Sequence, residues 1–80
     1  MYKMYWVEDE PNIYDGRRWW SVHTWRGNEF FVTALSSDAI EDALRAMGER
    51  LLLVAPQSPQ YAKFLWDRGE HIYKLVEEVN

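Results

Sequence analysis

The chain has 80 residues, which is the length of one small domain (residues 1–80), and its 48% hydrophobic content excludes intrinsic disorder over most of that length. A formal net charge of −4 argues against a mainly phosphate-binding surface, and the absence of cysteine excludes disulfide and thiolate chemistry. No stretch has the roughly 18 apolar residues of a membrane span, so we expect a cytoplasmic protein without a membrane partner.

Three segments in the N-terminal part have the composition of β-strands. Residues 2–7 are aromatic and β-branched, and this segment ends at the acidic run and proline of residues 8–11. We place a loop at residues 12–16, a second strand at residues 18–25 and a third at residues 29–35. Between the last two strands, Gly27-Asn28 is typical of a two-residue hairpin turn.

This turn sets the register of the predicted hairpin. Arg26 lies opposite Glu29, and Trp25 lies opposite Phe30. One face of the hairpin then carries Trp20, Val22, Thr24, Phe31, Thr33 and Leu35. The other face carries Trp19, Ser21, His23, Trp25, Phe30, Val32 and Ala34. A slip of the register would exchange members of these sets, but large apolar side chains lie on both faces in either case.

The next segments are predicted to form a helix and a short strand. Ser36-Ser37-Asp38 has the short oxygen-bearing side chains of a helix start, and Gly48 is a plausible end. The apolar residues between them recur at helical spacing: Ile40, Ala43, Leu44 and Met47. Residues 51–54 are compatible with an extension of this helix or with a short buried strand, and we favour the strand.

A second helix is predicted to begin with Ser58 as its N-cap and Pro59 as its first residue. Its apolar positions keep helical spacing nearly to the C-terminus: Tyr61, Phe64, Leu65, Ile72, Leu75, Val76 and Val79. Gly69 interrupts the pattern, so a kink or a division into two shorter helices is an alternative. The predicted fold class is α+β, a three-stranded antiparallel sheet with a possible short fourth strand. Both helices are expected on the sheet face that bears Trp20, Val22, Phe31 and Leu35.

The sequence contains no pattern typical of an active site. His23 and His71 are the only histidines, and neither has a partner at metal-ligand spacing. Ser21 and His23 share a strand face that holds them parallel rather than converging, and the four glycines are scattered, which leaves no phosphate cradle. We therefore predict no catalytic residue, no metal and no cofactor, and a protein that is not an enzyme.

The aromatic residues predict a binding surface instead. A small domain needs one apolar sheet face to fold, and a second such face is typical of a surface that contacts something else. Because Trp, Tyr and Arg dominate the energetics of protein interfaces, the predicted partner-binding residues are Arg17, Arg18, Trp19, Trp25, Arg26 and Phe30. The alternative is that the C-terminal helix covers this second face and leaves no such surface.

The preferred function is that of a non-enzymatic protein-interaction module, which acts stoichiometrically by occluding a surface of a larger partner. In size, acidity and lack of cysteine the chain is similar to phage-encoded inhibitors of host or defence machinery, including anti-CRISPR proteins, a likeness of composition and not of motif. The expected partner is a protein, for example a basic, nucleic-acid-binding complex, or a second copy in a homodimer.

The alternative function is binding of single-stranded nucleic acid by the Arg/Trp hairpin. Arg17 and Arg18 are followed directly by Trp19 and Trp20, and rings that stack on bases beside guanidinium groups are how such strands are held. Acidic residues near this segment weaken the positive field, so nucleic acid is the less favoured partner.

Overall fold

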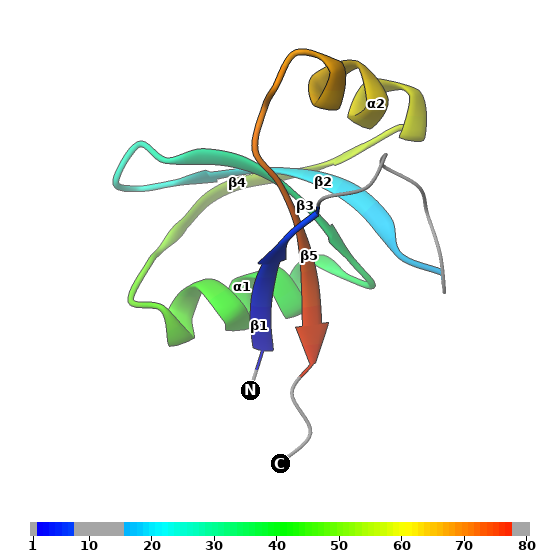
Figure 1. Ribbon diagram of the computed structural model, residues 1–80. Coiled ribbons are helices and arrows are strands. Elements are labelled where there is room, and N and C mark those ends of the chain that lie inside the picture. The colour runs from blue at the N-terminus through cyan, green and yellow to red at the C-terminus, as the bar shows by residue number, and fades with distance from the viewer. Residues whose placement is uncertain (1, 8–15, 78–80) are drawn as a thin grey trace.

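A computed structural model of the protein describes residues 2–7 and 16–77, and these form five strands and two helices. The strands are β1 (Tyr2–Trp6), β2 (Arg18–Thr24), β3 (Glu29–Ala34), β4 (Leu51–Gln57) and β5 (Ile72–Glu77), and the helices are α1 (Ser37–Ala46) and α2 (Pro59–Asp67). Figure 1 shows α2 above the sheet and α1 below it. The α+β class is confirmed. Neither helix combines the length and the apolar composition that crossing a membrane requires.

The sheet is mixed and has the strand order β1-β5-β3-β2-β4. β2 pairs antiparallel with β3 and β4, β3 pairs parallel with β5, and β5 pairs antiparallel with β1. The predicted three-stranded antiparallel sheet is therefore wrong, because β1 joins the C-terminal strand and not the hairpin. β1 and β5 cross the direction of β2 and β4 steeply in Figure 1, as expected of a strongly twisted sheet.

Several local predictions are confirmed. The hydroxyl of Ser36 accepts a hydrogen bond from the N–H of Ala39 (3.3 Å), and that of Ser58 accepts one from the N–H of Tyr61 (3.1 Å), so both serines are N-caps. The strand that we favoured at residues 51–54 exists as β4 and extends to Gln57, but the prediction that it is buried is wrong, because β4 is an edge strand and none of its residues is buried. β4 tolerates a proline, Pro56, because it is an edge strand.

The predicted long C-terminal helix is wrong, because α2 ends at Asp67. The N–H of Gly69 donates to the carbonyl of Trp66 (2.9 Å), and the N–H of Glu70 donates to that of Leu65 (3.0 Å). Together these bonds form the Schellman motif, which favours a glycine in the left-handed conformation, and Gly69 has a φ of +81°. Gly69 therefore ends the helix. It is neither a kink nor a break between two helices.

The apolar residues after Gly69 keep helical spacing for a different reason. β5 is an interior strand with a helix on each side, so Ile72 packs in the core beneath α2 while Leu75 packs in the core against α1. A strand that is covered on both faces does not alternate between apolar and polar residues. The spacing of these positions therefore imitates a helix.

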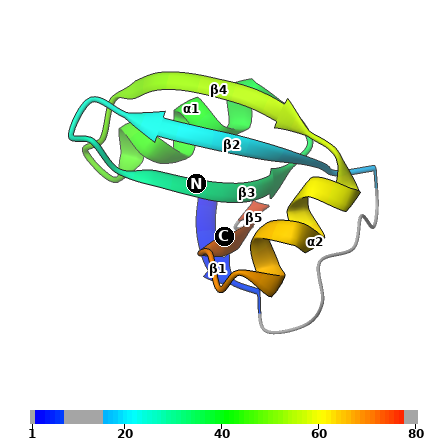
Figure 2. The same ribbon diagram turned by 90° about the horizontal axis from the view of Figure 1, so that it is seen from above.

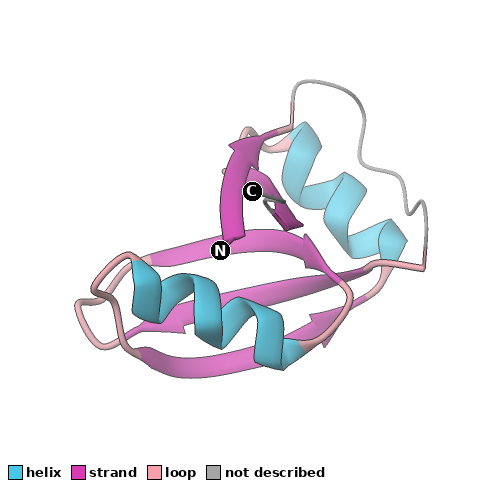
Figure 3. Ribbon diagram, turned by 90° about the horizontal axis from the view of Figure 1, so that it is seen from below, coloured by secondary structure: helices cyan, strands magenta, loops and turns pink. Residues whose placement is uncertain are grey.

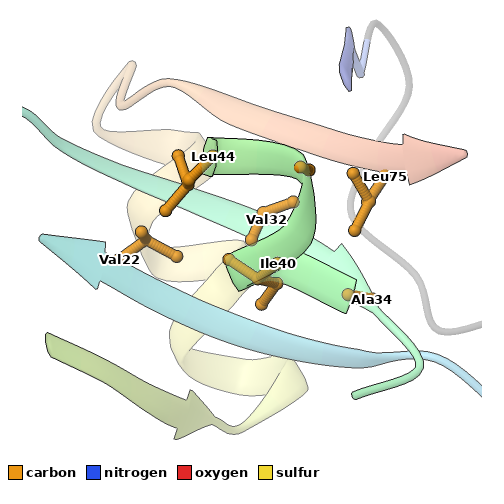
Figure 4. Packing of buried hydrophobic residues seen from close by; sticks show 7 residues of the cluster. Val22, Val32, Ala34, Ile40, Leu44 and Leu75 are labelled. Atoms are coloured by element: carbon orange, nitrogen blue, oxygen red, sulfur yellow. The ribbon is translucent and has the colours of Figure 1, made fainter. Parts of the chain in front are cut away.

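The two helices cover opposite faces of the sheet, and the prediction that both pack on one face is wrong. Figures 2 and 3 show the two faces, with α2 on the side seen from above and α1 on the side seen from below. The core on the α1 side, shown in Figure 4, consists of Val22, Val32, Ala34, Ile40, Ala43, Leu44 and Leu75. The core on the α2 side consists of Trp19, Phe31, Ala62, Leu65 and Ile72.

The hairpin register also differs from the predicted one. His23 lies opposite Glu29, and Val22 lies opposite Phe30, so β3 is shifted by three positions relative to the prediction. Because this shift is odd, it moves Phe31 to the face of Trp19 and Phe30 to the face of Val22. Trp25 therefore lies outside the paired strands and not opposite Phe30.

Candidate functional site

The β2–β3 turn places Trp25 and Arg26 at the tip of the hairpin. The N–H of Gly27 donates to the carbonyl of Thr24 (3.0 Å), and the N–H of Thr24 donates to the carbonyl of Asn28 (3.0 Å). With Gly27 at a φ of +85°, this is a three-residue loop whose last residue is left-handed. Residues within such a loop lie outside the paired strands, and the Trp25 side chain is 62% exposed.

A β-bulge in β4 exposes two leucines beside this turn. Leu51 lies opposite Thr24 and Leu53 lies opposite His23, so Leu52 is the extra residue that has no partner on β2. The bulge breaks the alternation of the strand, and Leu52 and Leu53 are 53% and 55% exposed. Two consecutive leucines are therefore left in solvent at the sheet edge.

Trp25, Arg50, Leu52 and Leu53 together form a surface that we name the hairpin corner. The N–H of Trp25 donates to the carbonyl of Arg50 (3.0 Å), which ties the turn to the start of β4. The Arg50 guanidinium lies over the Trp25 ring, with its carbon 5.6 Å from the ring centre. Figure 2 shows the β2–β3 turn and the start of β4 at the same end of the sheet. A hollow of about 240 Å³ is lined by Trp25, Arg50 and Leu51 and by the charged residues Glu41, Arg45 and Glu49.

The structure does not bring the six predicted partner-binding residues together. Arg17 and Arg18 lie at the start of β2, seven or eight residues before Trp25, which is about 25 Å along an extended chain. Arg17 donates a hydrogen bond from Nη1 to the backbone carbonyl of Leu75, and thereby ties the start of β2 to β5. Arg18 is exposed there.

The other predicted residues are distributed between the core and the hairpin tip. Trp19 is 2% exposed and packs beneath α2, so the alternative, in which the C-terminal helix covers this face, describes this part of the sheet. Phe30 is half-buried on the α1 side, where its ring meets that of Tyr73 edge-on at 5.9 Å. Arg26 is exposed and contacts the end of α1, through a hydrogen bond to the carbonyl of Gly48 (3.5 Å).

A second concave feature lies between the sheet and the end of α1, and we name it the α1 pocket. Its volume is about 480 Å³. Phe30, Tyr73 and His71 line it from β3 and from the start of β5, while Met4, Leu44 and Met47 line it from β1 and α1. Asn28, Glu29 and Glu49 complete the lining. This volume is in the range of small-molecule sites, roughly 300–1,000 Å³.

Sequence reasoning missed Arg50, Leu52 and Leu53 of the hairpin corner, and most of the α1 pocket. The exposure of the leucines depends on a bulge, for which the local sequence LLLV carries no signal. The pocket is assembled from four separate segments of the chain, and the β1–β5 pairing brings Met4 to the same pocket as Tyr73. Phe30 is the one residue of the predicted set that lines the pocket.

No group of three His, Cys, Asp or Glu side chains that could hold a metal ion occurs within residues 2–7 and 16–77. Nε2 of His23 and Oε1 of Glu29 lie 3.8 Å apart, which is a pair and not a group of three. Comparisons of the chain with models of protein families, with curated proteins and with solved structures found no match. The candidate site therefore depends on the geometry of the chain itself.

Proposed function

We propose that the chain is a protein-interaction module that acts stoichiometrically by occupying a surface of a larger partner, and that the hairpin corner is its contact surface. The observation that supports this most directly is the exposure of Trp25 at the hairpin tip together with that of Leu52 and Leu53 in the adjacent edge strand. Grouped apolar side chains of this size are typical of interfaces, and a tryptophan with a stacked arginine has the chemistry of an interface hot spot.

The backbone of β4 adds to this surface. β4 is the last strand of the sheet, so the hydrogen-bonding groups on its outer side pair with no strand of the described residues. A partner can add a strand to such an edge and gain main-chain hydrogen bonds, while Leu52 and Trp25 supply the apolar contact. Pro56 has no N–H, so strand addition is favoured along residues 51–55.

The acidic balance of the chain favours a basic partner, of which a nucleic-acid-binding complex is one example. We propose that this binding mode serves inhibition of host or defence machinery, and that the chain is a phage-encoded inhibitor. The competing occupant of the β4 edge is a second copy of the chain. Light scattering on the purified protein distinguishes the two, because our proposal expects a monomer in the absence of the partner.

The experiment that tests the proposal is photo-crosslinking in an extract of the native host. A photoreactive phenylalanine derivative replaces Leu52 in one protein and Phe64 in another, since Phe64 is exposed to a similar extent (51%) but lies on α2. We expect a protein partner to crosslink from position 52 and not from position 64. A homodimer in which position 52 crosslinks only to a second copy would contradict the proposal.

Affinity for the captured partner is then measured for two alanine variants. Trp25→Ala is expected to bind about thirtyfold more weakly, which corresponds to the roughly 2 kcal/mol of a hot-spot residue. Phe64→Ala serves as the matched control for the loss of an exposed ring and is expected to bind as the wild type does. Equal binding by Trp25→Ala and wild type, or a loss confined to Phe64→Ala, would refute the assignment of this surface.

A further inference from the structure

Two rings in the α1 pocket form an aromatic corner. The planes of Phe30 and Tyr73 are inclined by 85°, with ring centres 5.9 Å apart. The Tyr73 ring is held from its other side by Trp6, which meets it edge-on at 5.7 Å, and by His71, which stacks on it at 6.4 Å. Rings fixed by neighbours in this way retain their positions when a ligand binds, so little ordering cost falls on the binding step.

The part of the lining contributed by β1 and α1 is apolar and flexible. Leu44 is almost fully buried, and Met4 and Met47 present thioether side chains to the pocket. Methionine adapts its shape to fill irregular space, which suits a small apolar body. The pocket volume of about 480 Å³ lies within the range of small-molecule sites.

The charged groups at the pocket are mainly acidic. Glu29 and Glu49 line it, and the Glu49 side chain is only 17% exposed. Its Oε1 accepts a hydrogen bond from Nδ2 of Asn28 (3.3 Å), while its Oε2 is buried without a hydrogen-bond partner among the described residues. The Glu29 side chain is 57% exposed, so water screens its charge, and the less exposed Glu49 carboxylate exerts the stronger field on the pocket.

Two basic groups oppose these carboxylates from the solvent side. Nε of Arg26 lies 4.0 Å from Oε1 of Glu49, and Nε2 of His23 lies 3.8 Å from Oε1 of Glu29. The Arg26 side chain is 72% exposed, so water screens its charge, and neither Arg26 nor His23 lines the pocket. Among the described residues that line the pocket, His71 is the one nitrogen base, and none is a lysine or an arginine.

We propose that the α1 pocket binds a small organic cation with an apolar body, such as an alkylated ammonium compound. The positive group would lie against the faces of Phe30 and Tyr73, where aromatic rings attract cations, and within the field of Glu29 and Glu49. The apolar body would pack against the methionines. This site is distinct from the hairpin corner and does not depend on the proposed protein partner.

The test compares two probes of equal shape that differ in charge, choline and 3,3-dimethyl-1-butanol, on protein labelled with ¹³C at the methionine methyl groups. Choline is expected to shift the Met4 and Met47 signals saturably and to give nuclear Overhauser effects from its N-methyl protons to the rings of Phe30 and Tyr73. The neutral probe is expected to bind about fivefold more weakly, as loss of one cation–π contact predicts. Equal binding of the two probes, or no shift from choline, would overturn the proposal.

Charge variants test the carboxylates. The double variant Glu29→Gln/Glu49→Gln keeps an acceptor for Asn28 and is expected to weaken choline binding about threefold without changing the binding of the neutral probe. Glu41→Gln/Asp42→Asn removes the same charge from the outer face of α1 and is expected to leave choline binding unchanged. Equal losses in both double variants would show a general charge effect and would contradict a site. If the first variant does not fold, the comparison of the two probes on the wild type still decides.

A cation in this pocket can come from a free small molecule or from a side chain of a bound protein. A third probe distinguishes these two sources. Nα-acetyl-arginine amide carries the side chain of an arginine in a peptide. We expect it to bind more weakly than choline at the Met4 and Met47 methyl groups. Tighter binding of this probe would overturn the assignment to a free organic cation.

Discussion

Replacement of Gly69 by alanine tests whether α2 ends at Asp67. Gly69 has a φ of +81°, and a Cβ added there meets no heavy atom within 4 Å beyond its chain neighbours. The cost of the substitution is therefore conformational and not steric. The left-handed conformation costs an L-residue roughly 1–2 kcal/mol, and the smaller freedom of alanine in the unfolded chain offsets about 0.4–1 kcal/mol of it.

We expect Gly69→Ala to lower the free energy of unfolding by about 1 kcal/mol, and the Tm by roughly 4–8 °C for a domain of this size. A helix that continued through Gly69 would give the opposite sign, because alanine stabilises a helix interior by about 1 kcal/mol relative to glycine. The two arrangements therefore differ by about 2 kcal/mol, well above the error of a denaturation curve.

Urea denaturation followed by circular dichroism measures this difference. Gly48→Ala is the matched control, since Gly48 has a φ of +78° and ends α1 with the same pair of hydrogen bonds, from its own N–H to Arg45 and from Glu49 to Leu44. Both variants are expected to lose similar stability with an unchanged slope of the transition. A stabilised Gly69→Ala protein, beside a destabilised Gly48→Ala protein, would refute the helix end at Asp67.

Three further predictions follow from burial, capping and the placement of the basic residues. In urea denaturation, Trp19→Ala is expected to lower the free energy of unfolding by about 3–5 kcal/mol, and Trp25→Ala to change it by less than about 0.5 kcal/mol. Equal effects of the two substitutions would contradict the hairpin register. Ser58→Ala is expected to destabilise α2 by about 1 kcal/mol and Ser58→Gly by only a few tenths, in the same assay, so equal losses would exclude an N-cap. Single-stranded oligonucleotides are expected to show no salt-dependent binding in fluorescence anisotropy, because Trp19 is buried away from Arg18, and steep salt dependence that Arg18→Ala abolishes would favour the nucleic-acid alternative.

The parts of the fold that sequence predicted correctly are those that depend on a few adjacent residues. The N-caps at Ser36 and Ser58 and the helix end at Gly48 require only a short side chain or a glycine at one position. The same local rule identifies Gly69 as a helix end. The apolar spacing of Ile72, Leu75 and Val76 predicts instead that the helix continues. This spacing reflects a strand packed on both faces and is indistinguishable from a helical stripe in the sequence alone.

Strand pairing depends on distant contacts, and there the sequence carried less information. Nothing near β1 indicates that it pairs with β5, which is separated from it by the whole domain. The parallel pairing of β3 with β5 likewise depends on α1, β4 and α2 lying between them in sequence and on both sheet faces being covered. The candidate site inherits this difficulty, because the α1 pocket exists only when β1, β3 and β5 have been brought together.

The geometry of one turn decides both which rings enter the core and which remain exposed. With a two-residue turn, Trp25 would lie within the strand and Phe30 would share a face with Trp19. The three-residue loop instead brings Phe31 beside Trp19, where α2 covers both, and leaves Trp25 at the tip, outside the paired strands. Among the rings of the hairpin, the exposed one therefore lies at its end, and the other exposed rings of the described residues lie on β1 and α2. Since a turn exposes its residues whatever packs on the sheet, no rearrangement of α2 would bury Trp25, and any cover of its ring beyond the Arg50 guanidinium must come from another molecule.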